Sequence, residues 1–142
     1  MSMLNIFNVS GSAASAQSQR LNVVASNLAN ADTVAGPDGR AYKARQVTFQ
    51  TQLMGQVAHA ATADATSAGV TVSAITEDQT PGRRVHDPKH PQADGDGYVT
   101  YSNVNAVEEM VNMISASRSY QNNVEVMNTA KSLLLKTLQL GA

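Results

Sequence analysis

Apolar side chains recur every three or four residues along the last third of the chain. The mean step is close to 3.5 residues, the repeat of a coiled-coil seam. Asn105 with Glu108 three residues later resembles a capping box, and Gly141 suits the end of a helix. The pattern predicts a helix over about 105–140, roughly 50 Å long at 1.5 Å per residue. The repeating positions are Val107, Met110, Ile114, Ser117, Tyr120, Val124, Met127, Ala130, Leu134 and Leu138.

A weaker repeat predicts a second helix in the first thirty residues. Phe7, Ala14, Leu21 and Leu28 recur every seven residues. Because many of its contact positions carry only Ala, this helix is marginal in isolation and needs a partner face. The C-terminal stripe is the natural partner. We therefore expect the two ends of the chain to pack together as a long pair.

The middle of the chain has a different composition. All four Pro and all three His lie there, whereas every Asn lies in the two ends. Partly alternating runs at 42–53, 69–75 and 97–101 predict short strands. The stretch 54–68 is rich in Ala and Thr and has no assignable role. We predict a mainly α fold with a small β part, divided into an N-terminal helix (1–33), a central β-rich part with long loops (34–102) and a C-terminal helix (103–142).

Composition limits both the core and the function. The chain has 142 residues, 4% aromatic residues and no Trp, and much of its apolar content is Ala, so we expect extended helix packing rather than a large globular core. A net charge of -1 supplies no field for nucleic acid. The absence of Cys excludes disulfides and thiolate chemistry. No apolar run approaches the roughly 18 residues of a membrane span. The N-terminus lacks the basic start and apolar stretch of a secretory signal, which taken alone indicates the cytoplasm.

The best candidate for site chemistry is the segment 86–96. His86 and His90 lie there among three Asp residues, a set that binds metals in other contexts. Pro88 and Pro91 prevent an i, i+4 helical pair, so we favour a rigid Pro-rich loop over a metal-dependent enzyme. We predict no catalytic, cofactor-binding or metal-binding residues.

The Asn residues inside the predicted helices are harder to explain. Asn competes for local backbone hydrogen bonds and is a mediocre helix former. Asn30 suits the end of a helix. The amides further inside are either solvated or paired with other chains. These are Asn22, Asn27, Asn112, Asn122, Asn123 and Asn128.

The residues themselves resemble a known family. "SGSAASAQSQRLNVVASNLANADT" (10–33) is similar to the N-terminal motif of bacterial flagellar axial proteins, which form the rod and hook. "NVNAVEEMVNMISASRSYQNNVEVMNTAKSLLLKTLQLG" (103–141) is more specific. Together with "YKARQVTFQ" (42–50) and "RRVHDPKHPQADGDGYV" (83–99), it resembles the flagellar basal-body rod proteins.

This resemblance implies a structural subunit of the proximal rod, the helical drive shaft that crosses the periplasm and transmits torque. It implies export through the flagellar type III apparatus without a cleaved signal peptide, and terminal helices paired as a coiled coil. The implied partners are further copies, proximal and distal rod subunits, the adaptor between the rod and the export gate or MS ring, and the export apparatus. No cofactor, nucleic acid or membrane insertion is implied.

We divide the helical residues into two sets. The predicted intrachain seam consists of Leu21, Val24, Leu28, Ile114, Val124, Met127, Leu134 and Leu138. The predicted subunit interface consists of Asn22, Asn27, Asn30, Arg118, Tyr120, Gln121, Asn122 and Asn123. The alternatives are another flagellar axial subunit or, from a different class, a soluble helical adaptor or secreted effector that uses one amphipathic face.

Overall fold

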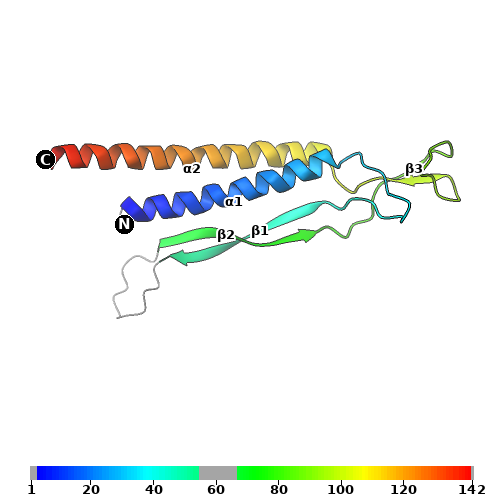
Figure 1. Cartoon of the computed structure of the whole chain (residues 1–142), viewed down its shortest axis with the longest axis horizontal. Helices are drawn as coiled ribbons and strands as arrows, with labels where there is room; N and C mark the ends of the chain where they lie inside the picture. Colours follow the sequence, from blue (N-terminus) through cyan, green and yellow to red (C-terminus); the bar gives the residue numbers. More distant parts are fainter. Residues whose placement is uncertain (1–2, 55–66, 142) are drawn as a thin grey trace. The chain divides into compact units, whose positions relative to one another are not determined.

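Two long helices and two small sheets make up the chain. The computed structural model describes residues 3–54 and 67–141. β1 pairs with β2, and β3 pairs with β4. The predicted mainly α fold with a small β part is confirmed. The elements in chain order are α1 (Met3–Ala29), β1 (Arg45–Met54), β2 (Ser67–Glu77), β3 (Arg84–His86), β4 (Tyr98–Thr100) and α2 (Ala106–Leu140) (Figure 1).

The strands match the alternating runs except for β3. The runs at 42–53, 69–75 and 97–101 correspond to β1, β2 and β4. β3 was not predicted, because three exposed residues carry no alternation that a sequence pattern can detect. The Ala/Thr-rich stretch 54–68 lies mostly outside the described residues.

Side-chain caps fix the helix ends. The Oδ1 atom of Asn105 accepts hydrogen bonds from the backbone N–H groups of Val107 (3.1 Å) and Glu108 (3.4 Å), as an N-cap does. At the end of α1, the side-chain amide of Asn30 donates to the carbonyl of Ser26 at 2.8 Å. The start of α2 and the end of α1 therefore lie where local chemistry predicts.

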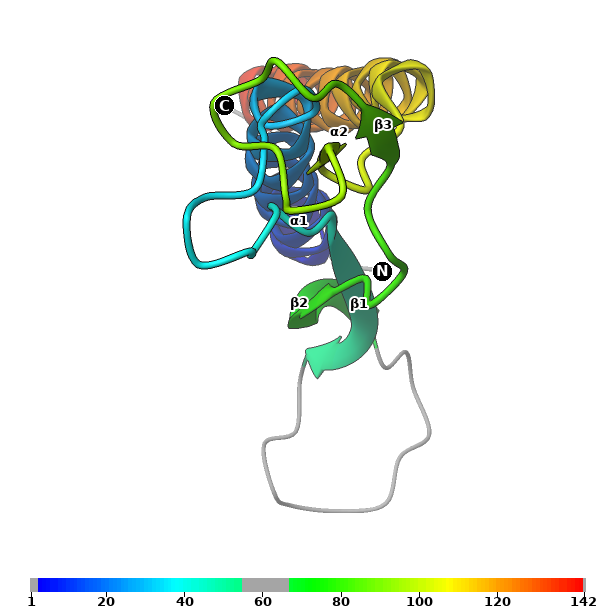
Figure 2. The same cartoon turned by 90° about the vertical axis from the view of Figure 1, so that its right-hand side faces the viewer.

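The loop between α1 and β1 contains a turn at 36–39, in the segment coloured light blue to cyan in Figure 2; its sequence, GPDG, has Pro at the second position and Gly at the fourth, as is typical of turns. The backbone N–H of Gly39 donates to the carbonyl of Gly36 at 2.9 Å. Gly39 has a φ of 72°, which a residue with a side chain rarely adopts. The turn is therefore formed as its Pro and Gly positions indicate.

The chain divides into two compact units, and each takes part of both helices. The first unit comprises the described residues of 1–20, 48–74 and 116–142; the second comprises 21–47 and 75–115. The predicted three-part division into 1–33, 34–102 and 103–142 stays a prediction.

Small residues allow close packing in the first unit. The hydroxyl of Ser12 donates to the carbonyl of Val9 (2.7 Å) and accepts the N–H of Val70 in β2 (3.1 Å). A Cβ atom at Gly69 would lie 2.7 Å from the Ser12 Oγ atom and would also collide with the Met54 side chain. Gly69 is therefore required for this approach of β2 to α1. The buried residues of this unit are Ser10, Ala14, Ala16, Ser67, Gly69, Ala116 and Ala130.

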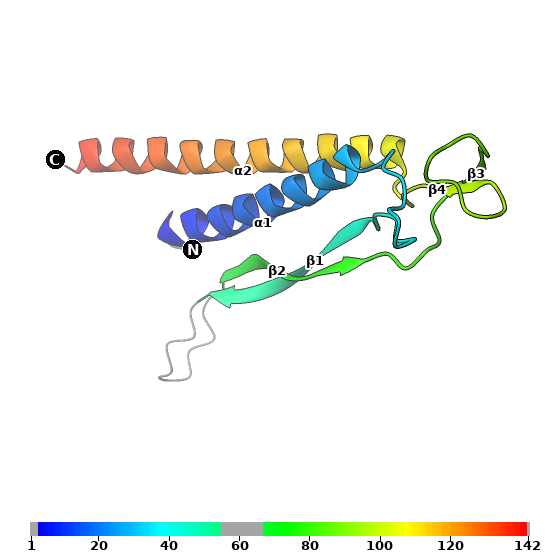
Figure 3. The same cartoon turned by 45° about the vertical axis from the view of Figure 1, so that its right-hand side comes forward.

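The second unit contains the antiparallel β3–β4 pair, with Val85 opposite Val99 (Figure 3). Val99 is completely buried. The N–H of Ala35 donates to the carbonyl of Thr100 at 2.8 Å, and Val34 forms a bridge with Tyr101. The segment after α1 thus pairs with the end of β4 and lies beside it as a third backbone segment.

Candidate assembly surface

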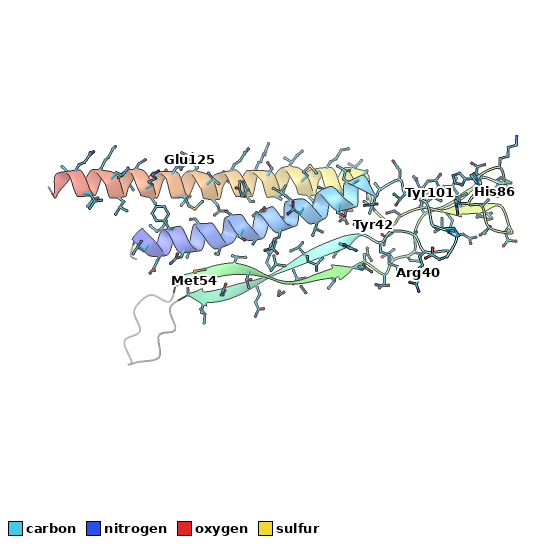
Figure 4. The ribbon with its side chains drawn as sticks, viewed as in Figure 1. Arg40, Tyr42, Met54, His86, Tyr101 and Glu125 are labelled. Atoms are coloured by element: carbon cyan, nitrogen blue, oxygen red, sulfur yellow. The ribbon has the colours of Figure 1, made fainter. Side chains whose placement is uncertain are left out.

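Asn27 lies in the interior of the second unit, with only 1% of its surface exposed. Its Nδ2 atom donates to the carbonyl of Arg45 (2.8 Å) and to the carboxylate of Glu109 (3.1 Å). Its Oδ1 atom accepts the N–H of Arg45 (2.9 Å) and the hydroxyl of Tyr42 (3.0 Å), the side chain labelled in Figure 4. Two donors and two acceptor positions are the full capacity of an amide. The prediction of Asn27 on a subunit interface is therefore corrected: its amide is used within the chain.

A second amide, that of Asn103, completes this arrangement. Its Oδ1 atom accepts the N–H of Ala44 at 2.7 Å. Its Nδ2 atom donates to the carbonyls of Asp78 and Thr80, each at 3.0 Å. Asn27 and Asn103, which we call the amide junction, together fix residues 44 and 45, where β1 begins. Sequence reasoning missed Asn103, because its partners are 23 to 59 residues away along the chain.

The other predicted interface residues are placed in two ways. Asn30 and Asn123 are half-buried, and each donates its amide to the carbonyl four residues earlier at 2.8 Å. Such back-bonding satisfies the amide locally. The remaining five are exposed, so their role in an interface stays a prediction. They are Asn22, Arg118, Tyr120, Gln121 and Asn122.

Only some of the eight residues predicted for the intrachain seam are shielded from solvent. Ile114 is 55% exposed and Leu138 is 62% exposed, so neither fills an intrachain seam. A 3.5-residue repeat drifts by about 20° per heptad around a straight helix. Between Ile114 and Leu134 the drift is larger, because the six steps of three or four residues cover only 20 residues where six helical turns need about 21.6; the two side chains therefore lie about 160° apart. Of the other members, Val24 is buried; half-buried are Leu21, Leu28, Val124, Met127 and Leu134.

Leu138 is exposed for a further reason. α2 has 35 residues and α1 has 27. At 1.5 Å per residue, about 12 Å of α2 has no matching length of α1. Apolar side chains at the C-terminal end of α2 are accordingly exposed, Leu138 by 62% and Leu140 by 89%.

An apolar stripe at the start of α2 is the clearest candidate surface. We call Val107, Met110, Val111 and Ile114 the outer stripe. Each is between 51% and 70% exposed. Their spacing of i, i+3, i+4 and i+7 puts them on one face of the helix. Contiguous exposed apolar side chains of this kind mark interaction sites.

The His-containing loop has a structural arrangement. The ring of His86, labelled in Figure 4, packs edge-on against Tyr98 with centroids 5.0 Å apart. The Arg84 guanidinium lies 4.8 Å from the Tyr98 ring and 2.8 Å from the Asp94 carboxylate. The backbone N–H of Tyr98, then that of Asp96, and after them the Arg84 guanidinium hold the pKa of Asp94 below its usual value. Within residues 3–54 and 67–141, no three His, Cys, Asp or Glu side chains are grouped to hold a metal ion.

Comparison with known proteins identifies the family. Residues 7–37 match the family described as flagella basal body rod protein, and 96–140 match the flagellar basal body rod FlgEFG protein C-terminal family. The chain is 56% identical to the flagellar basal-body rod protein FlgC of Salmonella typhimurium (strain LT2) and of Escherichia coli O157:H7, over 99% of both chains. It is 58% identical to that of Yersinia enterocolitica, again over 99% of both chains. The chain belongs to the FlgC family.

Membership of the FlgC family confirms the resemblance seen in the sequence. FlgC proteins are structural proteins of the flagellar basal-body rod. The chain is accordingly a structural subunit rather than an enzyme, as predicted. No helix among the described residues is long and apolar enough to cross a membrane.

Proposed function

We propose that the chain polymerises, with other rod proteins, into the proximal rod of the flagellar basal body and transmits torque across the periplasm. Family membership over 99% of the chain supports this role. We also propose export through the flagellar type III apparatus without a cleaved signal peptide. The proposed partners are further copies, proximal and distal rod subunits, and the adaptor between the rod and the export gate or MS ring. The matches of both terminal segments to rod-protein families support these partners.

The exposure of the outer stripe is the main observation that supports assembly with other subunits. The only fully buried side chains of any size in the described residues are Val99 and Asn27, whereas the four large apolar residues of the outer stripe are exposed. Burying one such side chain completely contributes about 1.5 to 3 kcal/mol. A neighbouring subunit that covers the outer stripe therefore adds several kcal/mol that the chain alone lacks.

The predicted coiled coil of α1 and α2 belongs to the same proposal. Ala116 and Ala130 are buried and lie two heptads apart on α2. Small side chains at that spacing favour a close pair of helices. The exposed polar residues then lie at lateral contacts, and contacts that do not close into a ring extend as a helical tube. These residues are Asn22, Arg118, Tyr120, Gln121 and Asn122.

Val111→Asp tests the proposal. The side chain is 61% exposed, so the purified variant should keep its helix content by circular dichroism. A charge buried in an interface is costly, so cells carrying only this variant should lose swarming and lack the chain in isolated basal bodies. Ser18→Asp, at an exposed position of α1, is the matched control and should leave both unchanged. Normal swarming and normal amounts of the Val111→Asp chain in basal bodies would contradict the proposal.

A further inference from the structure

An apolar groove runs along α2 in the first unit. Its volume is about 440 Å³. Ile6 of α1 forms one wall, and residues of α2 spaced by three or four form the rest. Its single ionisable side chain is that of Glu125, which is exposed. We call this the α2 groove. From α2 it is lined by Asn122, Glu125, Val126, Thr129, Ala130 and Leu133.

The other side of α2 carries a complementary ridge. Leu135 is 51% exposed and Leu138 is 62% exposed, and Lys131 lies one turn before Leu135. We call Lys131, Leu135 and Leu138 the leucine ridge. Leu133 of the groove and Leu135 of the ridge lie about 160° apart around the helix at 100° per residue. The ridge therefore cannot fill the groove of its own chain.

We propose that the leucine ridge of one copy docks in the α2 groove of a second copy, with Lys131 opposite Glu125. The inference rests on the proposed function, because it specifies one contact within the rod. Charge complementarity supports the choice of a second copy: the C-terminal part of α2, from 126 to 140, has two Lys and no acidic residue, whereas the groove has only an acidic one. Apolar side chains meet apolar side chains along the rest of the contact.

The spacing along the helix fits two parallel copies. Seven residues separate Lys131 from Leu138, and eight separate Glu125 from Leu133. With Lys131 opposite Glu125, Leu138 comes to lie beside Leu133, and the copies are offset by about 9 Å at 1.5 Å per residue. Because ridge and groove lie on opposite sides of one helix, the contact is heterologous and can repeat.

A charge exchange tests the ion pair. Glu125→Lys and Lys131→Glu each place like charges in contact, so each should lower the amount of the chain in basal bodies about fivefold or more. The double variant Glu125→Lys/Lys131→Glu should restore at least half of it. An ion pair within one helix cannot explain such a recovery, because residues 125 and 131 lie six apart in sequence and about 120° apart around α2. Both positions are exposed, and unchanged circular dichroism will show that the variants fold. Single variants that assemble normally, or a double variant no better than either, would overturn the proposal.

Disulfide trapping tests the docking itself, since the chain has no Cys of its own. Oxidised basal bodies with Leu133→Cys/Leu138→Cys should contain cross-linked dimers and larger multimers of this chain. The single variant Leu138→Cys, which has no cysteine in the groove, should give none. Assembled rods without cross-links, or cross-links to a different protein, would overturn docking to a second copy. If the wild-type chain is absent from basal bodies, the proposed function fails instead. In that case the same oxidation of concentrated purified protein decides the docking, through dimers or their absence.

Discussion

Replacing Asn27 by Ala removes the central side chain of the amide junction. The substitution removes one hydrogen-bond partner from four groups: the N–H and carbonyl of Arg45, the Tyr42 hydroxyl and the Glu109 carboxylate. The Tyr42 hydroxyl keeps its contact with Ser26, and the Glu109 carboxylate keeps the amide of Asn112. The two side-chain groups belong to half-buried residues, so they can turn toward water. The backbone groups of Arg45 have no such freedom, because β1 begins there.

The cost follows from these groups. A buried backbone group left unpaired costs about 1 to 3 kcal/mol; because Arg45 is an exposed residue, the lower part of that range applies, roughly 2 to 4 kcal/mol for its two groups. Ala is a better helix former than Asn by about 0.6 kcal/mol, which offsets part of this. We expect a net loss of about 1.5 to 3.5 kcal/mol, equivalent to a roughly 10- to 400-fold increase in local opening.

Hydrogen–deuterium exchange measures this opening at the Asp78 amide. That N–H donates to the carbonyl of Ala44 at 2.8 Å and does not touch Asn27 directly, so faster exchange reports loss of the junction. Asn22→Ala is the matched control, since Asn22 lies on the same helix and is exposed. The control should leave Asp78 exchange unchanged and slightly raise helix stability.

A shape-matched variant separates hydrogen bonding from packing. Asn27→Asp keeps the size of the side chain but replaces the donor with a carboxylate oxygen about 3 Å from that of Glu109. It should open the junction at neutral pH and recover partly in acid, when a carboxylate is protonated. The reasoning is refuted if Asn27→Ala exchanges like Asn22→Ala, or if Asn27→Asp shows no dependence on pH.

Two further predictions concern the β strands. Gly69→Ala should expose the β2 amides to hydrogen–deuterium exchange, because the added Cβ would lie 2.7 Å from the Ser12 Oγ atom. Gly11→Ala is the control: its added Cβ meets no atom within 4 Å, and it should stabilise α1 by about 0.5 to 1 kcal/mol in thermal unfolding. The pKa of Asp94 is lowered in the folded chain, first by the N–H of Tyr98. The ionised carboxylate therefore stabilises the fold at pH values above the ordinary Asp pKa near 4. This stabilisation is lost as the pH falls through the lower pKa of the folded chain. NMR signals of the β3–β4 pair should therefore shift and broaden in acid, and Asp94→Asn should show that state already at pH 7; an unchanged spectrum in the variant would contradict this.

Local chemistry made much of the fold predictable. The helix at 105–140, its Asn105 cap and the turn at 36–39 depend on residues close together in sequence, and the structure contains all three. The family was recognisable for a related reason, since its terminal motifs are continuous stretches of the chain. The scarcity of large buried side chains likewise follows from an Ala-rich composition.

Tertiary structure decided what each side chain of a helix does. Asn22 and Asn27 look alike in the sequence, yet one is exposed and the other is buried. The difference arises because Arg45 and Glu109, 18 and 82 residues away from Asn27, approach only that face of α1. The repeating apolar positions of α2 likewise look alike in the sequence but differ in exposure. Their spacing determined that a helix forms, but the phase of a straight helix and the shorter length of α1 left Ile114 and Leu138 outside the seam. Periodicity specifies a helix from local geometry, whereas the partner of each face depends on contacts between residues distant in the sequence.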